Sequence, residues 1–326
     1  MVGINDNKSK IFKILLIGAG NLGSRYLQGL LDVNQKCNIY VVDHSKKALD
    51  LIKKRIIDIK SHHHEIFLEN EMPENTHKFD LAIVATTAKF RAKIIFDLKA
   101  KYVIDYWIIE KILAQSISDL NQIYSCIGDS KKAWVNTPRR IMPLYKNIKD
   151  KIHGDKKGPI NIDIKGGEWG LACNAIHFID LFEWINDSRV LDIDSSSIKF
   201  WKSSKRKGFV EAIGTLTVLF SDKSKLRLVC FDKKADLQIK IETQNGLWTI
   251  NEKEGFAQDY QNLIIKGELL YQSNLTGPLV EEIISLGKIN LTSIEQSIRQ
   301  HTKMIESFLE SWNTIYKKND KIIEIT

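Results

Sequence analysis

The sequence predicts an α/β fold in which a doubly wound parallel sheet is followed by an α+β domain with an open, mostly antiparallel sheet. Two observations predict it. Near the N-terminus an apolar strand leads into a glycine-rich turn and a helix, and strands and helices then alternate. The second half carries short strands separated by turn signals. Because 326 residues are ample for two domains, we place them at residues 1–140 and 141–326.

Composition narrows the class of protein. Hydrophobic residues make up 43% of the chain and charged residues 27%, which is typical of a globular protein. The apolar runs are far shorter than the ~20 residues that span a bilayer, and the first ten residues lack a signal-peptide layout, so we expect no membrane partner. The four cysteines form no C-x-x-C pair, which favours a reducing, cytoplasmic location.

The net charge of +8 raises the question of a nucleic-acid partner. The lysines are spread along the chain and recur beside acids, as in EKEGF and KKNDK, which favours a solvated basic surface. We therefore expect no nucleic acid, whereas anionic small molecules are compatible with the charge.

The first candidate site follows the apolar run Ile14–Ile17, which suits a central parallel strand. The turn after it has the pattern G-x-G-x-x-G and consists of Gly18, Ala19, Gly20, Asn21, Leu22 and Gly23. In such a turn the first glycine permits the bend, the second lets a pyrophosphate approach the backbone, and the third lets helix and strand pack closely. With a strand before it and a helical pattern after it, this turn predicts a dinucleotide-binding Rossmann domain.

Asp43 ends the next predicted strand, Cys37–Val42, twenty residues beyond Gly23. A carboxylate at this place accepts hydrogen bonds from an adenosine ribose and repels a 2′-phosphate, which favours NAD as the cofactor. The residues 44–47 that follow (His-Ser-Lys-Lys) are able to hold a 2′-phosphate, so NADP stays open. The competing interpretation is a glycine turn with no ligand.

The alternation of the first domain continues beyond Asp43. The expected elements are a helix near 46–59, a strand at 81–85, a helix near 89–101 and a strand at 106–109. Ligands of a doubly wound sheet gather at the carboxyl ends of its strands, which adds Ala85, Thr86 and Glu110 to the cofactor-binding candidates. The run His62-His63-His64 lies between such elements, and since adjacent side chains cannot all point at one ion, we interpret it as a solvated loop and expect no metal site.

The second half alternates in short segments that suggest an antiparallel meander. The expected strands are 196–201, 209–220, 225–231, 237–243 and 247–251. Two late segments, 279–286 and 293–316, have helical spacing and are able to cover either the first domain or the sheet. An exposed sheet of this size favours pairing with another copy, so we expect a homodimer or homotetramer formed through it.

The stretch WGLACNAIHFIDLFEW, residues 169–184, predicts a helix that is buried on most of its circumference. At 100° per residue Cys173, His177, Asp180 and Trp184 share one narrow face, which we expect to look toward a cleft. By itself, a lone histidine in an apolar helix is a packed core residue. Asn174 is placed to cap the start of the helix, or to reach a sugar hydroxyl.

Three motifs in this chain resemble those of one family. Glu110-Lys111 follows the expected fifth strand, Asn136–Pro143 (NTPRRIMP) follows the sixth, and His177 precedes Asp180 by three residues. With the glycine turn, they resemble the family of glucose-fructose oxidoreductase, inositol dehydrogenase and MocA. Members of this family carry Glu-Lys-Pro, an N-x-R-x-x-P-like segment, and a histidine with an aspartate three residues later. The resemblance covers about half of the chain and implies the two-domain fold predicted above.

The resemblance implies an oxidoreductase that transfers a hydride between nicotinamide and a secondary alcohol or keto group of a sugar-like substrate. Lys111 and His177 have the residue types that this chemistry needs, a positive charge at the developing alkoxide and an acid/base. Arg139 and Arg140 are able to clamp an anionic substrate or to pair with acids between the domains. The substrate-binding candidates are Trp169, Arg140, Cys173, Asn174 and Asp180.

Two positions depart from the family pattern. Ile112 stands where the family has proline, which we expect to alter only backbone stiffness. Cys173 stands where the family commonly has an aspartate, and its thiol removes a carboxylate that could orient His177, a role that Asp180 is placed to take over. The rival hypothesis is therefore a non-catalytic NAD(P)-binding sensor or regulatory protein that retains the fold.

Overall fold

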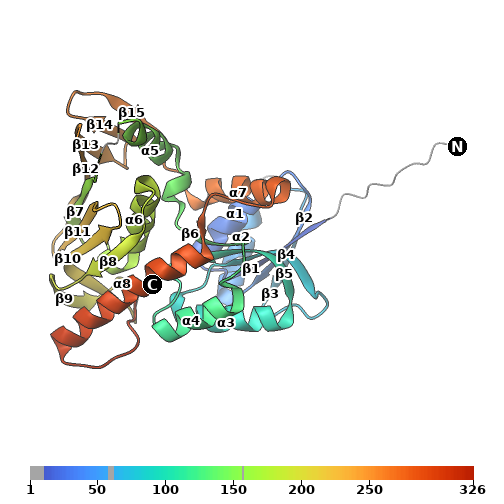
Figure 1. The fold of residues 1–326 in the computed structure, drawn as a ribbon. Helices are drawn as coiled ribbons and strands as arrows, with labels where there is room; N and C mark the ends of the chain where they lie inside the picture. Colours follow the sequence, from blue (N-terminus) through green and yellow to red (C-terminus); the bar gives the residue numbers. More distant parts are fainter. Residues whose placement is uncertain (1–10, 58–61, 156–157) are drawn as a thin grey trace. The chain divides into compact units, whose positions relative to one another are not determined.

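The computed structural model describes residues 11–57, 62–155 and 158–326 (Figure 1). It has the predicted α/β fold, with one largely parallel sheet and one mostly antiparallel sheet. The chain forms two compact units. The first unit contains the chain up to Thr86, Asp97–Ile108 and Tyr271–Ile289, and the second contains Thr87–Phe96, Ile109–Leu270 and Asn290–Thr326. Where the sequence predicts one boundary at residue 140, the chain passes between the units several times.

The first unit has the doubly wound pattern. Its elements are β1 (Phe12–Ile17), α1 (Asn21–Leu30), β2 (Cys37–Val42), α2 (Lys46–Ile57), β3 (Glu65–Glu69), β4 (Lys78–Val84) and α7 (Gln272–Leu286), while α3 (Ala88–Lys101) and β5 (Val103–Glu110) contribute to both units. Strand β1 is central and pairs in parallel with β2 and β4, with Ile14 opposite Ile39 and Leu81. These strands are buried, as their near-continuous apolar sequences predict. The last two residues of the predicted helix 46–59 lie outside the described residues.

Helix α7 belongs to the first unit, although it comes late in the chain. It packs against α1 and buries Leu275, Leu279, Val280 and Ile283. The sequence leaves open whether this segment covers the first domain or the sheet of the second, and the structure shows that it covers the first.

The histidine run precedes β3, an edge strand that pairs in parallel with β2 and that the sequence pattern does not reveal. His63 is exposed, but His64 is buried, and its Nδ1 accepts the backbone N–H of Cys37 at 3.2 Å. The solvated-loop interpretation is therefore wrong for His64. Burial lowers the pKa of His64, so the ring stays neutral and keeps its acceptor nitrogen.

The second unit is built on a nine-stranded sheet. Its strands are β7 (Asn161–Gly167), β8 (Val190–Asp194), β9 (Ile198–Ser203), β10 (Val210–Phe220), β11 (Lys225–Phe231), β12 (Ala235–Thr243), β13 (Gly246–Asn251), β14 (Phe256–Asp259) and β15 (Ile264–Lys266). The predicted meander is wrong at one place. Strand β7 lies between β11 and β12 and runs parallel to β11, because it enters the sheet before the helix that precedes all the other strands.

Helices and short strands complete the second unit. They are α4 (Ile117–Ile127), β6 (Ala133–Asn136), the 3₁₀ helix η1 (Pro138–Ile141), α5 (Pro143–Asp155), α6 (Leu171–Asn186), β16 (Thr292–Ser293) and α8 (Ile294–Tyr316). Helix α6 packs on β10 and β11 and against η1 and α8. Its half-buried residues are Cys173, Asn174, His177 and Trp184, whereas Asp180 is fully buried. Of the four residues on the predicted narrow face, Cys173, His177 and Trp184 are therefore partly accessible and Asp180 is not.

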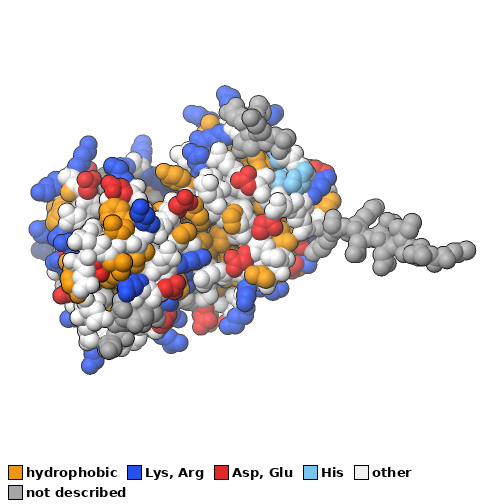
Figure 2. All heavy atoms as spheres, turned by 90° about the horizontal axis from the view of Figure 1, so that it is seen from above, with side chains coloured by type: hydrophobic (Ala, Val, Ile, Leu, Met, Phe, Trp, Pro, Cys, Tyr) orange, Lys and Arg blue, Asp and Glu red, His pale blue; other side chains and the backbone are white. Residues whose placement is uncertain are grey.

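Two further observations concern partners. In the part of the chain that the structure describes, no helix combines the length and the apolarity needed to cross a membrane. On the face drawn in Figure 2, lysine and arginine side chains are interspersed with aspartate and glutamate, as their spacing along the sequence predicts.

Candidate functional site

The glycine turn of the first unit shows which of its glycines packing requires. Gly18 has φ +102°, and a Cβ on it would lie 3.1 Å from the carbonyl carbon of Ala85. A Cβ on Gly23 would collide with the carbonyl oxygen of Gly18. A Cβ on Gly20, in contrast, would meet no atom within 4 Å. Packing therefore explains two of the three glycines, and the third borders open space of the kind that a phosphate needs.

Helix α1 begins at this turn with its N–H groups directed outward. Gly20 is the N-cap residue, no side chain caps the helix, and its first turn contains no acid. Leu22, a residue of the predicted glycine turn, is 38% exposed there. An uncapped helix N-terminus carries a partial positive charge, which suits an anionic ligand.

Asp43 lies directly against the glycine turn. Its carboxylate accepts the N–H of Ala19 at 2.7 Å and that of Ser45 at 2.8 Å, and its side chain is 13% exposed. Each carboxylate oxygen can accept a second hydrogen bond, so the group can also bind ribose hydroxyls. Ala85 and Thr86 follow β4 beside Gly18, and the N–H of Ala85 donates to the carbonyl of Ile17 at 2.8 Å. The predicted cofactor residues of the first unit thus lie together.

Lys111 stands at the carboxyl end of β5 and belongs to the second unit. Its Nζ donates to the carbonyl oxygen of Cys173 at 3.2 Å and to Sγ of Cys173 at 3.1 Å. The peptide bond between Lys111 and Ile112 is cis. Two hydrogen bonds lie next to this peptide bond. Arg91 donates to the carbonyl oxygen of Ile112, and the N–H of Leu113 donates to Nε2 of His301 at 3.1 Å.

His177 lies one turn beyond Cys173 on α6. Burial lowers the pKa of His177 well below its ordinary value, and the positive charges of Lys111 and Arg139 lower it further. Its Nδ1 is buried and has no hydrogen-bond partner among the described residues. The imidazole is therefore neutral at pH 7, which is the form that accepts a proton.

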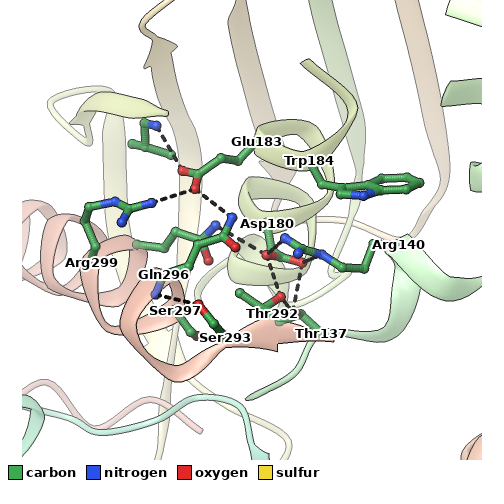
Figure 3. A network of polar contacts seen from close by, with 12 residues as sticks. Thr137, Arg140, Asp180, Glu183, Trp184, Thr292, Ser293, Gln296, Ser297 and Arg299 are labelled. Atoms are coloured by element: carbon green, nitrogen blue, oxygen red, sulfur yellow. Dashed lines mark hydrogen bonds and ion pairs between the residues drawn. The ribbon is translucent and has the colours of Figure 1, made fainter. Parts of the chain in front are cut away.

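Arg140 and Asp180 bind each other (Figure 3). Nε of Arg140 donates to Asp180 at 3.0 Å, Nη2 donates to the other carboxylate oxygen, and both residues are buried. Asp180 also accepts from Thr137 at 2.9 Å, Thr292 at 2.6 Å and Gln300 at 3.3 Å. This corrects two expectations, because Arg140 is paired with an acid rather than open to a substrate, and the bonds of Asp180 go to residues other than His177.

Arg139 is also paired with an acid. Its guanidinium forms two hydrogen bonds with Glu252, at 2.8 and 3.2 Å, and stacks over the ring of Phe178 at 4.3 Å. The hydroxyl of Tyr145 donates to the same carboxylate at 2.6 Å. Both arginines therefore pair with acids, as the second alternative expects, but these acids belong to the same unit as the arginines and do not lie between the domains.

The remaining candidates are Asn174 and Trp169, at the start of α6, and Glu110, the last residue of β5. Asn174 does not cap the helix, since its amide donates to the carbonyl of Trp169 at 2.7 Å. The ring of Trp169 donates to the carbonyl of Val229 and packs edge-on against Phe178. Glu110 accepts a hydrogen bond from Asn136 at 2.6 Å. The cap is instead supplied by Glu211 of β10, which the sequence analysis missed. The signal that could have found it is a single acid in the apolar run VEAIGTLTVLF.

His301 makes the stability of the second unit depend on pH. Burial lowers the pKa of His301 to about 3, and Nδ1 donates to the carbonyl of Ser297 at 2.8 Å. Below pH 6.5 the unfolded chain binds a proton at this residue and the folded chain does not, so stability falls as the pH drops. Between pH 7 and pH 5 the free energy of unfolding should fall by about 2 kcal/mol less in His301→Asn than in the unmodified chain.

Urea unfolding at the two pH values measures this difference. The matched control is His77→Asn, which replaces an exposed histidine of the first unit and leaves His301 in place. If His301→Asn lost as much stability as the unmodified chain between these pH values, the assignment to His301 would be wrong.

No group of three or more His, Cys, Asp or Glu side chains that could hold a metal ion occurs among the described residues.

Comparison with known proteins agrees with the fold. The sequence model of the ketopantoate reductase PanE/ApbA family matches residues 14–102, about a quarter of the chain. This is not the family that the motifs resemble. None of the curated proteins matches the chain by sequence.

Similar solved structures span nearly the whole chain. A scyllo-inositol dehydrogenase from Lactobacillus casei with bound NAD(H) and scyllo-inositol has a TM-score of 0.68 at 16% identity, over 94% of this chain and 98% of its own. An oxidoreductase from Agrobacterium radiobacter in complex with NAD⁺, L-tartaric acid and magnesium has a TM-score of 0.70 at 16% identity, over 93% and 96%. A myo-inositol dehydrogenase from Corynebacterium glutamicum has a TM-score of 0.66 at 12% identity, over 94% and 97%. The chain shares the fold of these oxidoreductases.

Proposed function

We propose that this chain is an NAD(P)-dependent oxidoreductase that transfers a hydride between nicotinamide and a secondary alcohol or keto group of a sugar-like substrate. The observation that carries the proposal is the glycine turn, in which Gly20 borders open space at the uncapped start of α1. The similar structures support the substrate class, because two of the three described above are inositol dehydrogenases. The motifs shared with the glucose-fructose oxidoreductase, inositol dehydrogenase and MocA family support it as well.

The residues of the first unit fit a dinucleotide. The N–H groups at the start of α1 would hold the pyrophosphate, and Asp43 would accept the ribose hydroxyls. We propose NAD rather than NADP, because the carboxylate of Asp43 would repel a 2′-phosphate. Fluorescence titration with NADH and NADPH tests this choice, and tighter binding of NADPH would reverse it.

Two residues of the second unit supply the acid/base chemistry. When bound, the cofactor accepts or donates the hydride. The ammonium of Lys111 has three N–H donors, of which two are directed at Cys173, so the third can donate to the reacting oxygen as its negative charge develops. The neutral imidazole of His177 can accept the hydroxyl proton when the alcohol is oxidised and return it in the reverse direction.

Removing the Lys111 ammonium tests the proposal. Lys111→Met is expected to lower kcat/KM at least about a hundredfold, because the charge at the reacting oxygen is lost, while NADH affinity stays within about threefold. Turnover is followed at the nicotinamide absorbance with a panel of sugars, polyols, sugar phosphates and nucleotide sugars. The matched control is Lys199→Met, an exposed lysine on β9.

The rival function predicts a different result. A sensor or regulatory protein would bind NADH without turnover on any member of the panel, and Lys111→Met would change nothing that the assay measures. If the chain bound neither NADH nor NADPH, both functions would be excluded.

We also propose a homodimer or homotetramer formed through the sheet of the second unit, acting in the cytoplasm. Phe200, Phe231 and Leu247 expose between 36% and 39% of their surface on strands of this sheet. All four cysteines are reduced thiols, in keeping with a reducing compartment. Light scattering at micromolar concentration tests the assembly, and finding only monomer would count against it.

A further inference from the structure

A buried carboxylate lies at the start of α6, on the residue that Lys111 contacts. Oε2 of Glu211 accepts the N–H of Ala172 at 2.9 Å and the N–H of Cys173 at 3.4 Å. These are N–H groups of the first helical turn, which need acceptors from outside the helix. The N-cap residue is Gly170, and the first turn contains no acid, so neither can supply the acceptor. Glu211 supplies it from β10.

The loop before α6 leaves room for this carboxylate. Gly170 has φ +76°, and a Cβ on it would lie 3.3 Å from Oε1 of Glu211, closer than ordinary contact. Two residues earlier, Glu168 also has a positive φ, +50°, and its side chain is held by Lys202 at 2.9 Å. A larger residue at position 170 would therefore crowd both Nδ2 of Asn174, at 3.1 Å, and the carboxylate of Glu211.

Glu211 and Lys111 carry opposite charges, and both bind Cys173. Glu211 holds the N–H of Cys173, while Lys111 binds the carbonyl oxygen and Sγ of Cys173. Two titratable side chains of the described residues interact electrostatically with Glu211, the ammonium of Lys111 and the thiol of Cys230 on β11. Burial raises the pKa of Glu211, and the positive charge of Lys111 and the two helix N–H groups oppose this rise.

We propose that Glu211 is a positioning residue for the reaction proposed above. Its carboxylate fixes residue 173 and, through that residue, the ammonium of Lys111. Glu211 thereby supplies from β10 the negative charge that the thiol of Cys173 does not supply. The inference rests on the proposed function. It explains how a chain with cysteine at position 173 keeps a carboxylate beside its lysine. A simple helix cap would stabilise α6 without affecting Lys111.

Glu211→Gln separates these two roles, because glutamine keeps the shape and one acceptor oxygen but removes the charge. We expect kcat to fall about tenfold to a hundredfold with KM changed less than about threefold, since Lys111 is displaced rather than the substrate site. The part of the low-pH limb of the kcat profile that comes from protonation of Glu211 should be absent from the variant, whereas the part that comes from protonation of His177 should remain. Glu242→Gln, an exposed acid on β12, is the matched control and should leave both measurements unchanged.

Two rescue variants strengthen the test. Glu211→Asp keeps the charge on a shorter side chain and should recover part of the lost kcat. Adding Cys173→Asp to Glu211→Gln returns a carboxylate to the same turn of α6 and should recover at least about a third of it. If the double variant were no better than Glu211→Gln, a charge beside Lys111 would not be what Glu211 contributes.

A second measurement decides the inference without turnover. The rate at which acetic anhydride modifies Lys111 at pH 8, read by peptide mass spectrometry, should rise at least about threefold in Glu211→Gln, because residue 173 is fixed less firmly and the amine that it binds becomes more accessible. The peptide that contains Lys199 serves as the internal control. An unchanged Lys111 rate would overturn the proposal, whatever the melting temperature of the variant. Failure of the proposed function would appear instead as NADH binding without turnover, or as no binding at all.

Discussion

Replacing Asp180 by alanine is expected to lower the free energy of unfolding of the second unit by about 3–5 kcal/mol. The carboxylate is fully buried and accepts hydrogen bonds from Arg140, Thr137, Thr292 and Gln300, which come from η1 and its N-cap, β16 and α8. Without it, the guanidinium of Arg140 keeps its charge in a site from which water is excluded. The cost is that of an uncompensated charge, and it exceeds the loss of any one hydrogen bond.

Urea unfolding followed by tryptophan fluorescence measures this loss, since six of the seven tryptophans belong to the second unit. The matched control is Asp163→Ala on β7, which removes a partly exposed ion pair with Arg227 and should cost less than about 1 kcal/mol. The double variant Asp180→Ala with Arg140→Met should be more stable than Asp180→Ala alone, because the stranded charge is gone. The hydroxyl oxygens of Thr137 and Thr292 already lie 2.6 Å apart, so these two side chains can form a hydrogen bond with each other. Equal stability of the single and double variants would contradict this account.

Alanine at Gly23 and alanine at Gly20 are both expected to weaken NADH binding, but only alanine at Gly23 is expected to lower stability. At Gly23 the added methyl group collides with the backbone of Gly18, so the turn must open, and we expect a loss of about 3 kcal/mol or more together with loss of NADH binding. At Gly20 the methyl group meets nothing within 4 Å, so stability should change by less than about 1 kcal/mol. NADH affinity should nevertheless fall about tenfold or more, because the methyl group occupies the approach of the pyrophosphate.

The two variants control for each other, because they carry the same substitution in the same turn. Thermal unfolding and NADH fluorescence titration give the two readings. A Gly20→Ala variant that binds NADH as tightly as the unmodified chain would remove the main support for a dinucleotide at this turn. A stable Gly23→Ala variant would instead show that the backbone there adapts to a side chain.

The parts of the site that could be predicted from the sequence are those whose residues lie close together along the chain. The glycine turn and Asp43 depend on one strand, one turn and the next strand, and a strand followed by a helix fixes their relative places. The exposed face of α6 was predictable for the same reason, since the helical period alone brings Cys173 and His177 onto one side.

The parts that could not be predicted depend on residues far apart in sequence. Asp180 shares the face of His177 by periodicity, but its partners come from 40 to 120 positions away, and no local pattern shows that they meet it. Glu211 reaches the start of α6 from a strand 38 positions after Cys173. Strand β7 was missed because it precedes α6 in sequence, whereas its neighbours in the sheet follow that helix.

The position of α7 bears on how the chain can fold during synthesis. This helix, Gln272–Leu286, covers α1 within the first unit, yet it is translated more than two hundred residues after α1 ends. A ribosome that has produced only the first 140 residues has not yet supplied the helix that shields this apolar surface, and domains that fold during synthesis usually do so from the N-terminus onward. The first unit must therefore wait for α7 before α1 is covered, and a gene truncated after residue 140 would yield a fragment with an uncovered, aggregation-prone side.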